Sequence, residues 1–370
     1  MIRQAALLIA FASSLYALPV FIGTGAGKNG TGKGIYRADF DPDTGTLTAP
    51  ALAVEYRNPG FLAQHPTKPV LLAVGAPNQP FTDGSSAVAA FSIAADHGLK
   101  FLGEASTGGK GACHLAVDPS GGTVAVANYG DGRISTIRLD EQGVPVETVS
   151  VMVHRGSGPN RARQEGPHAH GVYFVPEPSS LLLVPDLGLD RVHVYPFDAA
   201  TSKTGDALAP YVTAPGSGPR HLAFSPDWQH LYLIRELDSS VQVVNNGKDH
   251  FSPLGAVSTL PAGFTGKNTT AEIEVGPDGR FVYASNRGHD SIAVFRRDPE
   301  SGALALVQHA PCGGKTPRHF KIAPGGKWLL CAHLDSNTIS VLPLDPLTGR
   351  LGGPAGTVSV PAPICILFAR

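Results

Sequence analysis

Short runs of apolar residues recur along the chain at nearly constant intervals, each after a loop rich in Gly and Pro. Seven runs can be aligned, and six of them end at a proline: GFLAQHP (60–66), CHLAVDP (113–119), HGVYFVP (170–176), RHLAFSP (220–226), AEIEVGP (271–277), RHFKIAP (318–324) and ICILFAR (364–370). Successive prolines are separated by 53, 57, 50, 51 and 47 residues. β-type runs repeated at about fifty residues are typical of propellers, so we predict an all-β fold with one run on the innermost strand of each blade.

The two ends of the chain complete this pattern. The N-terminus supplies three strand-like segments, PVFIGT, GIYRADF and ALAVEY, without an innermost strand, and the C-terminus supplies the isolated run ICILFAR. Pairing them would make a seventh blade and remove the exposed sheet edges. We therefore predict one domain, residues 18–370, that is a seven-bladed β-propeller closed by the C-terminal strand joining the N-terminal blade.

The first residues, MIRQAALLIAFASSLYA, have no counterpart in any other repeat. A basic residue, an apolar run and small residues near Ala17 predict a signal peptide over 1–17, and hence a periplasmic or secreted protein; a buried N-terminal strand or helix is the alternative.

A net charge of −1 argues against nucleic acid as a partner. We also expect a monomer, with no membrane association in the mature form and no cofactor.

The four cysteines form no C-x-x-C motif, so their spacing predicts no zinc or thioredoxin site.

The segment GTGAGKNGTGKG (23–34) formally contains G-x-G-x-x-G and nearly a P-loop. Both phosphate-binding motifs require a following helix, whereas the next segment, GIYRADF, reads as a strand. We interpret it as a glycine-rich hairpin loop.

Polar and ionisable residues occur where the innermost strands begin and where the second strands end. We expect them to lie close together, because both positions are at the same mouth of the channel. The residue six positions before each proline is Gly60, Cys113, His170, Arg220, Ala271 or Arg318, and the next is Phe61, His114, Gly171, His221, Glu272 or His319. The residue ten positions after each proline is Ala76, Tyr129, Asp186, Glu236, Arg287 or Leu334. This convergence predicts a polar binding or catalytic site, although water-filled propeller channels also carry satisfied polar groups.

The loop 154–169, HRGSGPNRARQEGPHA, is an extra stretch that leads into the same mouth. It carries Arg155, Arg161, Arg163, Gln164 and His168. These residues predict a basic lid over an anionic ligand, and a solvated loop is the alternative.

Four segments resemble a known family: GPRHLAFSPDWQHLYLIRELDSSVQVV (218–244), PHAHGVYFVPEPSSLLLVPDLGLDRVHVY (167–195), GPDGRFVYASNRGHDSIAVF (276–295) and TPRHFKIAPGGKWLLCAH (316–333). They are similar to the seven-bladed propeller lactonases, which include bacterial propeller-type 6-phosphogluconolactonases and fungal carboxy-cis,cis-muconate cyclase. The resemblance implies a lactone-handling site in which His170, Arg220, Glu236 and Arg287 are catalytic. His168 is a less favoured match for the histidine. Many relatives carry Asn where this chain has Arg235, which leaves the local charge open.

Ring opening of a lactone needs a base for water and a cationic group for the developing oxyanion. Glu236 and His170 are both candidates for the base, and the arginines would clamp a carboxylate or phosphate. We expect substrate contacts from His168, His221, Arg318, Arg163, Gln164 and Asp186, and no metal. The predicted function is hydrolysis of a small anionic sugar-type lactone; the alternatives are a carboxy-muconate cycloisomerase and a non-catalytic propeller that binds a ligand or protein.

Overall fold

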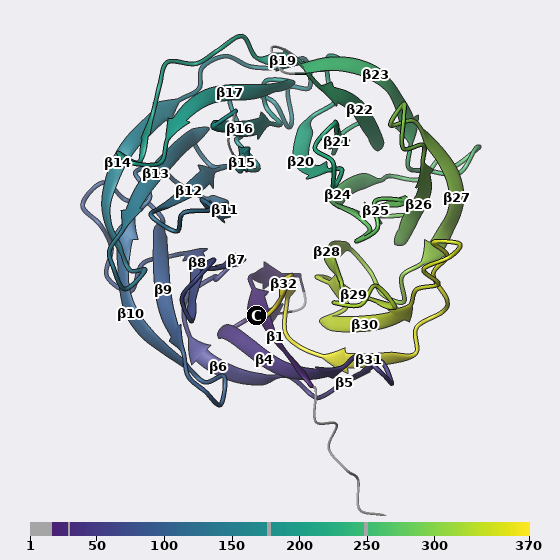
Figure 1. Ribbon diagram of the computed structural model, residues 1–370, viewed down its shortest axis with the longest axis horizontal. Helices are drawn as coiled ribbons and strands as arrows, with labels where there is room; N and C mark the ends of the chain where they lie inside the picture. Colours follow the sequence, from purple (N-terminus) through teal and green to yellow (C-terminus); the bar gives the residue numbers. More distant parts are fainter. Residues whose placement is uncertain (1–16, 29, 176–178, 248–250) are drawn as a thin grey trace, which may run out of the picture.

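Seven antiparallel sheets surround a central channel in the computed structural model, which describes residues 17–28, 30–175, 179–247 and 251–370 (Figure 1). The predicted signal peptide lies outside the described residues except for Ala17. No helix in the described part of the chain has the length and apolar character needed to cross a bilayer. The prediction of a seven-bladed propeller is confirmed.

All seven aligned runs are innermost strands: β7 (Phe61–Gln64), β11 (Ala112–Val117), β15 (Tyr173–Val175), β20 (Pro219–Phe224), β24 (Thr269–Val275), β28 (Pro317–Ile322) and β32 (Pro363–Phe368). The second strands are β8 (Val70–Gly75), β12 (Thr123–Asn128), β16 (Leu181–Asp186), β21 (His230–Arg235), β25 (Phe281–Arg287), β29 (Trp328–His333) and β1 (Leu18–Thr24). The start of each innermost strand pairs with the end of the second, as in Pro219 opposite Arg235. This register brings the predicted layers to one mouth.

The third and outer strands complete each blade. They are β4 (Gly34–Asp41), β5 (Thr46–Leu47), β6 (Ala51–Glu55), β9 (Ala87–Ile93), β10 (Leu99–Ser106), β13 (Arg133–Leu139), β14 (Pro145–Val153), β17 (Arg191–Asp198), β18 (Lys203–Thr204), β19 (Tyr211–Val212), β22 (Ser240–Asn246), β23 (Phe251–Ser258), β26 (Ser291–Arg297), β27 (Leu304–Pro311), β30 (Thr338–Pro343) and β31 (Gly356–Ser359).

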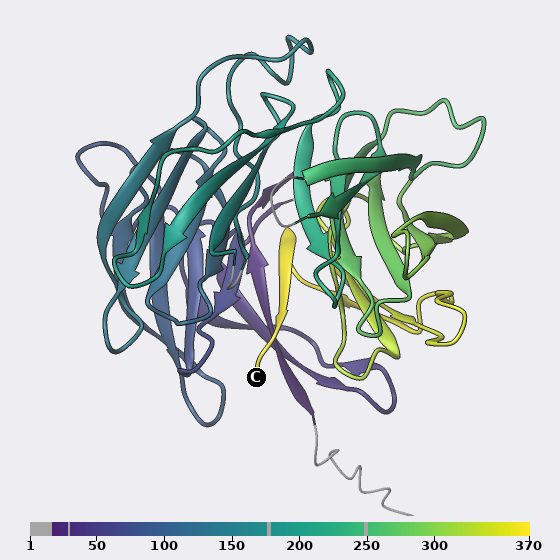
Figure 2. The ribbon, with the colours of Figure 1, turned by 45° about the horizontal axis from the view of Figure 1, so that its top comes forward.

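The ring is closed by the C-terminal strand. β32 pairs antiparallel with β1, with Val20 opposite Phe368 and Gly23 opposite Cys365. Figure 2 shows the yellow C-terminal strand lying beside the purple N-terminal strand. The first blade therefore contains the first and the last strand of the described residues, as the sequence pattern predicts.

The glycine-rich segment forms a hairpin of β2 (Ala26–Gly27) and β3 (Gly30–Thr31), followed by the strand β4. Gly34 stands where a P-loop would carry Ser or Thr, and a Cβ there would lie 2.0 Å from the carbonyl oxygen of Val54. Backbone packing therefore explains this glycine, and the interpretation as a hairpin is confirmed.

The core lies between neighbouring blades. Seven clusters of buried apolar side chains are found among the described residues, one at each blade-to-blade interface. Each strand alternates its side chains between the two faces of its sheet, so one blade packs against both neighbours. These interfaces fix the blades and hold the channel-lining residues in place.

Candidate functional site

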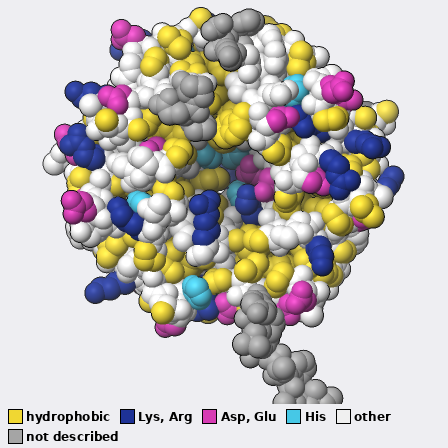
Figure 3. Space-filling model, viewed as in Figure 1, with side chains coloured by type: hydrophobic (Ala, Val, Ile, Leu, Met, Phe, Trp, Pro, Cys, Tyr) yellow, Lys and Arg dark blue, Asp and Glu magenta, His cyan; other side chains and the backbone are white. Residues whose placement is uncertain are grey.

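A pocket of about 280 Å³ occupies the mouth of the channel at the start of the innermost strands. Figure 3 shows the hollow at the centre of the disc, with charged and histidine side chains gathered around it. The pocket is lined by Gly25, Ala26, Asn58, Gly60, Phe61, Ala112, Cys113, His170, Arg220, His221, Glu272, Arg318, His319 and Ile364. Its volume lies just below the range of roughly 300–1,000 Å³ typical of ligand pockets, which suits a small ligand.

Beside this pocket, the Glu236 carboxylate is enclosed by three arginines. Oε2 lies 3.0 Å from Arg220 Nε and 2.9 Å from Arg287 Nη2, while Oε1 accepts a hydrogen bond of 2.7 Å from Arg163 Nη2. His170 Nε2 lies 3.9 Å from Oε2. The structure thus brings together the four residues predicted to be catalytic, and it adds Arg163 from the loop 154–169.

This environment sets the charge of Glu236, whose side chain is only 3% exposed. Burial alone would raise the pKa of the carboxyl, but Arg287, Arg220 and Arg163 lower that pKa to about 2. Glu236 is therefore ionised at neutral pH, and its oxygens are occupied by guanidinium groups.

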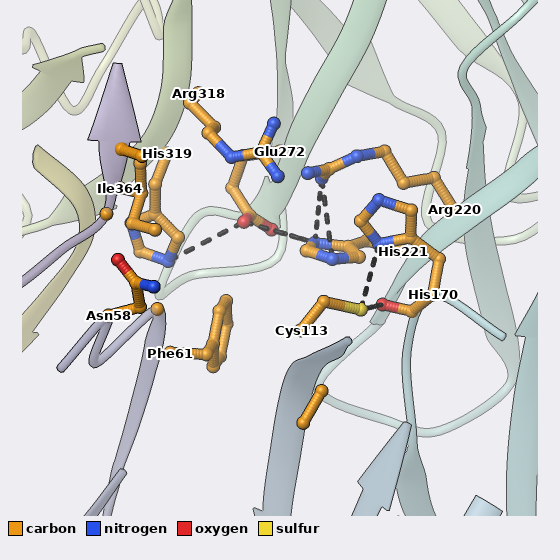
Figure 4. A pocket seen from close by; sticks show the side chains of 14 residues that line it. Asn58, Phe61, Cys113, His170, Arg220, His221, Glu272, Arg318, His319 and Ile364 are labelled. Carbon is orange, nitrogen blue, oxygen red and sulfur yellow. Dashed lines mark hydrogen bonds and ion pairs between the residues drawn. The ribbon is translucent and has the colours of Figure 1, made fainter. Parts of the chain in front are cut away.

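A second acidic group lies across the mouth. His221 Nδ1 lies 3.1 Å from Glu272 Oε2, and His319 Nε2 lies 3.5 Å from the same oxygen. Figure 4 shows the two imidazoles directed toward Glu272 from opposite sides. Arg220 also donates a hydrogen bond of 2.5 Å to the carbonyl oxygen of Ala271, which fixes its guanidinium at the rim.

Three buried histidines of the mouth, His170, His221 and His319, are neutral at physiological pH. Burial, followed by the charge of Arg220, holds the pKa of His170 and that of His221 well below the usual value. Burial also lowers the pKa of His319 to about 4. A neutral imidazole can accept a proton, so His170 has the protonation state that a general base requires.

Arg318 differs from the other arginines of the site. It lines the pocket, yet no ion pair or hydrogen bond joins its side chain to any described residue. Burial, then the charges of Arg220 and Arg287, lower its pKa to about 10, so it remains a cation at neutral pH. An unpaired guanidinium facing a pocket is suited to bind an anion.

The thiol of Cys113, which lies beside His170, is unreactive. Cys113 Sγ lies 3.9 Å from His170 Nδ1, and burial raises the pKa of this thiol to about 12. Because the thiolate is the nucleophilic form, Cys113 is not arranged as a nucleophile.

The structure places two of the predicted substrate contacts, Asp186 and Gln164, among protein partners. Asp186 accepts a hydrogen bond of 2.6 Å from His154 Nδ1 and one of 2.8 Å from the backbone N–H of His168. Gln164 Nε2 donates to Asp190 Oδ1 and to the carbonyl oxygen of Leu187. Asp186 and Gln164 are both fully buried, so they support the loop 154–169 and offer no surface to a ligand.

The remaining loop residues divide into two groups. Arg163 turns inward to Glu236, whereas Arg155 and Arg161 are exposed to solvent. His168 also points to protein partners, with Nδ1 2.8 Å from the carbonyl oxygen of Tyr129 and Nε2 3.1 Å from Glu165. Only Arg163 thus delivers the positive charge expected of a basic lid to the site.

Arg235 faces away from the channel. Its guanidinium contacts Asp238 at 2.9 Å, Ser240 at 2.7 Å and Gln242 at 3.1 Å, all around its own blade. The departure from the family pattern at this position therefore does not change the charge of the pocket.

Several pocket residues were not among the predicted site residues: Gly25, Ala26, Phe61, Cys113, Glu272 and His319. Phe61, Glu272 and His319 occupy the same alignment position as His221. The alignment of the repeats therefore indicated that they lie at the same mouth. The contribution of the hairpin residues Gly25 and Ala26 depends on how the loop folds over the mouth.

Comparisons with known proteins agree with this architecture. A family model described as "Lactonase, 7-bladed beta-propeller" matches residues 19–368. A Bacillus subtilis (strain 168) protein named 6-phosphogluconolactonase is 35% identical over 348 residues, which cover 93% of this chain and 97% of the relative.

Two solved structures are similar over nearly their whole length. The Pseudomonas aeruginosa periplasmic gluconolactonase has a TM-score of 0.88 at 28% identity, covering 96% of this chain and 99% of that one. A Lactobacillus plantarum protein has a TM-score of 0.88 at 30% identity, covering 96% and 100%.

Proposed function

The chain belongs to the seven-bladed β-propeller lactonase family, and from this premise we propose that it hydrolyses a small, anionic sugar-type lactone at the mouth lined by His170, Arg220 and Arg318. The observation that carries the proposal is the pairing of a neutral, buried histidine with an unpaired arginine in one small pocket. A proton acceptor and a free cation are the two groups that hydrolysis of an anionic ester requires.

In the proposed reaction, His170 takes a proton from a water molecule as that water attacks the lactone carbonyl carbon. Negative charge develops on the carbonyl oxygen, and the guanidinium of Arg220 stabilises it at the rim of the pocket. The bond between the carbonyl carbon and the ring oxygen then breaks, and the proton returns from His170 to that oxygen. The product is an open-chain hydroxy acid.

Glu236 is assigned a positioning role in this scheme. A carboxylate with a pKa of about 2 is a weak base, and its oxygens are already occupied by Arg163, Arg220 and Arg287. By balancing their charge, Glu236 keeps three guanidinium groups close together beside the pocket. Of the two candidates for the base, we therefore favour His170.

Arg318 is proposed to hold the anionic group of the substrate. It has no protein partner among the described residues and faces the cavity, where a carboxylate or a phosphate could pair with it. His221 lies beside it and could hydrogen-bond a sugar hydroxyl. A relative named 6-phosphogluconolactonase supports a sugar lactone as the substrate class.

We also propose that the protein is exported. The N-terminal segment supports this, as does similarity to a protein described as periplasmic. N-terminal sequencing of the protein from a periplasmic fraction should give a mature chain that starts near residue 18. Recovery there of a chain that still carries residues 1–17 would contradict export by cleavage.

The activity is tested by following acid release in a pH-stat with six-carbon aldonolactones, phosphorylated and unphosphorylated. We expect turnover of at least one lactone, and we expect His170→Gln to lower kcat by about 10²–10⁴-fold. His97→Gln, at a turn far from the channel, is the matched control. Full activity of His170→Gln would overturn the site, and the absence of turnover with every lactone would overturn the function.

A further inference from the structure

Two cysteines and a histidine meet inside the interface between two blades, away from the channel. Cys331 and His333 are two residues apart in β29, so their side chains lie on the same face of that strand. Cys312 directly follows β27 of the neighbouring blade. The two sulfur atoms and one ring nitrogen all lie within 4.8 Å of one another, and all three residues are 0% exposed.

The hydrogen bonds around His333 determine which ring nitrogen carries the proton. Ser340 Oγ donates its one proton to the carbonyl oxygen of Cys312 at 2.6 Å. The same hydroxyl lies 2.9 Å from His333 Nε2, so it must accept a hydrogen bond from Nε2–H. Nδ1 is therefore unprotonated, and its lone pair is on the side of Cys312 Sγ, 3.8 Å away. Metal-bound histidines commonly have their other ring nitrogen fixed in this way.

The separation of Sγ and Nδ1 fits a shared cation. Metal bonds of about 2.3 Å to sulfur and about 2.0–2.1 Å to nitrogen place the two ligand atoms about 3.6–3.8 Å apart for angles between tetrahedral and trigonal. The observed distance is 3.8 Å. A cation could therefore enter without a change in the distance between these two atoms.

The loop that carries Cys312 is packed tightly against the histidine. A Cβ on Gly314 would lie 2.4 Å from His333 Cγ, and Gly313 adopts a φ of +85°, so this turn depends on both glycines. Cys312 Sγ also lies 3.0 Å from the carbonyl oxygen of Asp290, which could serve as a fourth ligand.

We propose that Cys312, Cys331 and His333 bind one soft cation, Zn²⁺ or Cu⁺, that joins the loop 312–316 to β29. Two thiolates and an imidazole select such cations over Mg²⁺ or Ca²⁺, which prefer oxygen ligands. Cu⁺ is suited to the three side chains alone, whereas Zn²⁺ would complete a tetrahedron with the Asp290 carbonyl. The cation would fasten two neighbouring blades to each other.

A second group of possible ligands in the described residues lacks this arrangement. In the set His154, Asp186 and His193, both nitrogens of His154 are already engaged, Nδ1 by Asp186 at 2.6 Å and Nε2 by Tyr195 at 2.9 Å. The two imidazoles also stack with their centroids 3.6 Å apart. Stacked rings do not direct their lone pairs at a common point, so we assign no metal to this set.

The proposal is tested on the full chain, expressed and purified under reducing conditions with either Zn²⁺ or Cu⁺ as the only added metal. Elemental analysis should give one ion per chain after dialysis against a weak chelator. X-ray absorption at the edge of that ion should show two sulfur ligands and one imidazole nitrogen, and the number of remaining ligands distinguishes three-coordinate Cu⁺ from four-coordinate Zn²⁺. Loading should raise Tm by several degrees, because an ion that binds only the folded chain stabilises it.

Cys331→Ala and His333→Gln should each lower metal affinity at least tenfold. Cys365→Ala, which removes a buried cysteine of the first blade, is the matched control and should retain the ion. If the ligand variants fail to fold, the absorption spectrum of the wild-type protein still decides. No bound ion, a shell of oxygen and nitrogen alone, or a Cys312–Cys331 disulfide seen as the loss of two hydrogens by mass would overturn the proposal.

Discussion

Arg220 and Glu236 form a buried ion pair, with Nε 3.0 Å from Oε2, between the start of the innermost strand and the residue after the second strand of one blade. The register of β20 and β21 creates this contact, since Pro219 lies opposite Arg235. The next blade contributes Arg287 to the same carboxylate oxygen, at 2.9 Å. The repeating blades thus place Arg220 and Arg287 against one acid, and the extra loop 154–169 adds Arg163. A fourth arginine, Arg318, has no ion-pair partner among the described residues and is available to bind a ligand.

Glu236→Gln should destabilise the fold and reduce activity. Removal of the negative charge leaves Arg220 and Arg287 buried without a counter-charge, and breaking such a pair costs about 3–5 kcal/mol. Urea unfolding should show this loss in the free energy of unfolding. Glu141→Gln, in an exposed turn, serves as the control and should be neutral. A Glu236→Gln protein as stable as the wild type would contradict the assigned charge balance.

Arg318→Gln should lower the activity without lowering the stability of the fold. The variant loses the unpaired cation, so we expect kcat/KM for an anionic lactone to fall by about 10²–10³-fold. Tm should stay constant or rise, because a partly buried charge without a partner is no longer desolvated. Lactone kinetics and thermal unfolding measure the two effects, with the exposed Arg350→Gln as the control. A variant that keeps full activity, or one that loses stability together with activity, would count against Arg318 as the anion-binding group.

Acid should weaken the fold at pH values where most carboxylates are still ionised. Burial holds the pKa of His114, His170 and His221 well below the usual value of about 6.5, and it lowers that of His319 to about 4. Below pH 6.5 the unfolded chain therefore binds more protons than the folded chain, so the histidine contribution is complete above pH 6.5 and is lost as the pH falls toward 4.

Urea unfolding at pH 7 and pH 5 tests this dependence. The free energy of unfolding should be smaller at pH 5, and His114→Gln should reduce the difference because one titrating group is gone. Equal stability at both pH values would show that these imidazoles are not held neutral in the folded protein.

Ring closure should depend on the C-terminal strand. Ile366 in β32 is 1% exposed and packs in the interface with the last blade, so Ile366→Ala should cost about 2–5 kcal/mol. Leu347→Ala removes a side chain that is 76% exposed and should change stability by less than about 0.5 kcal/mol. Chemical denaturation compares the two, and a similar effect of both substitutions would contradict a closing role for β32.

The repeat in the sequence was sufficient to predict the ring, its closure and the meeting of His170, Arg220, Glu236 and Arg287. These properties follow from strand period and register, which the prolines align. Asp186 occupies the same alignment position as Glu236, yet it turns toward the loop 154–169 because His154 and the backbone of His168 bind it. No periodicity specifies that direction, since it depends on the path of the loop 154–169.

The cluster of Cys312, Cys331 and His333 lay beyond sequence reasoning for a related reason. The spacing between Cys312 and Cys331 matches no metal-binding motif, and the two residues come from neighbouring blades. Their contact depends on how a Gly-Gly turn packs on an imidazole, which is a property of the folded interface.

The most direct test of the proposed site is a crystal structure of the protein soaked with the sugar acid formed by its best lactone substrate. We predict that this acid lies in the pocket at the start of the innermost strands, with an anionic group paired to Arg318 and its carboxylate within reach of both Arg220 and His170. Binding only at the opposite mouth of the channel, or an empty pocket at saturating concentrations of the acid, would contradict it.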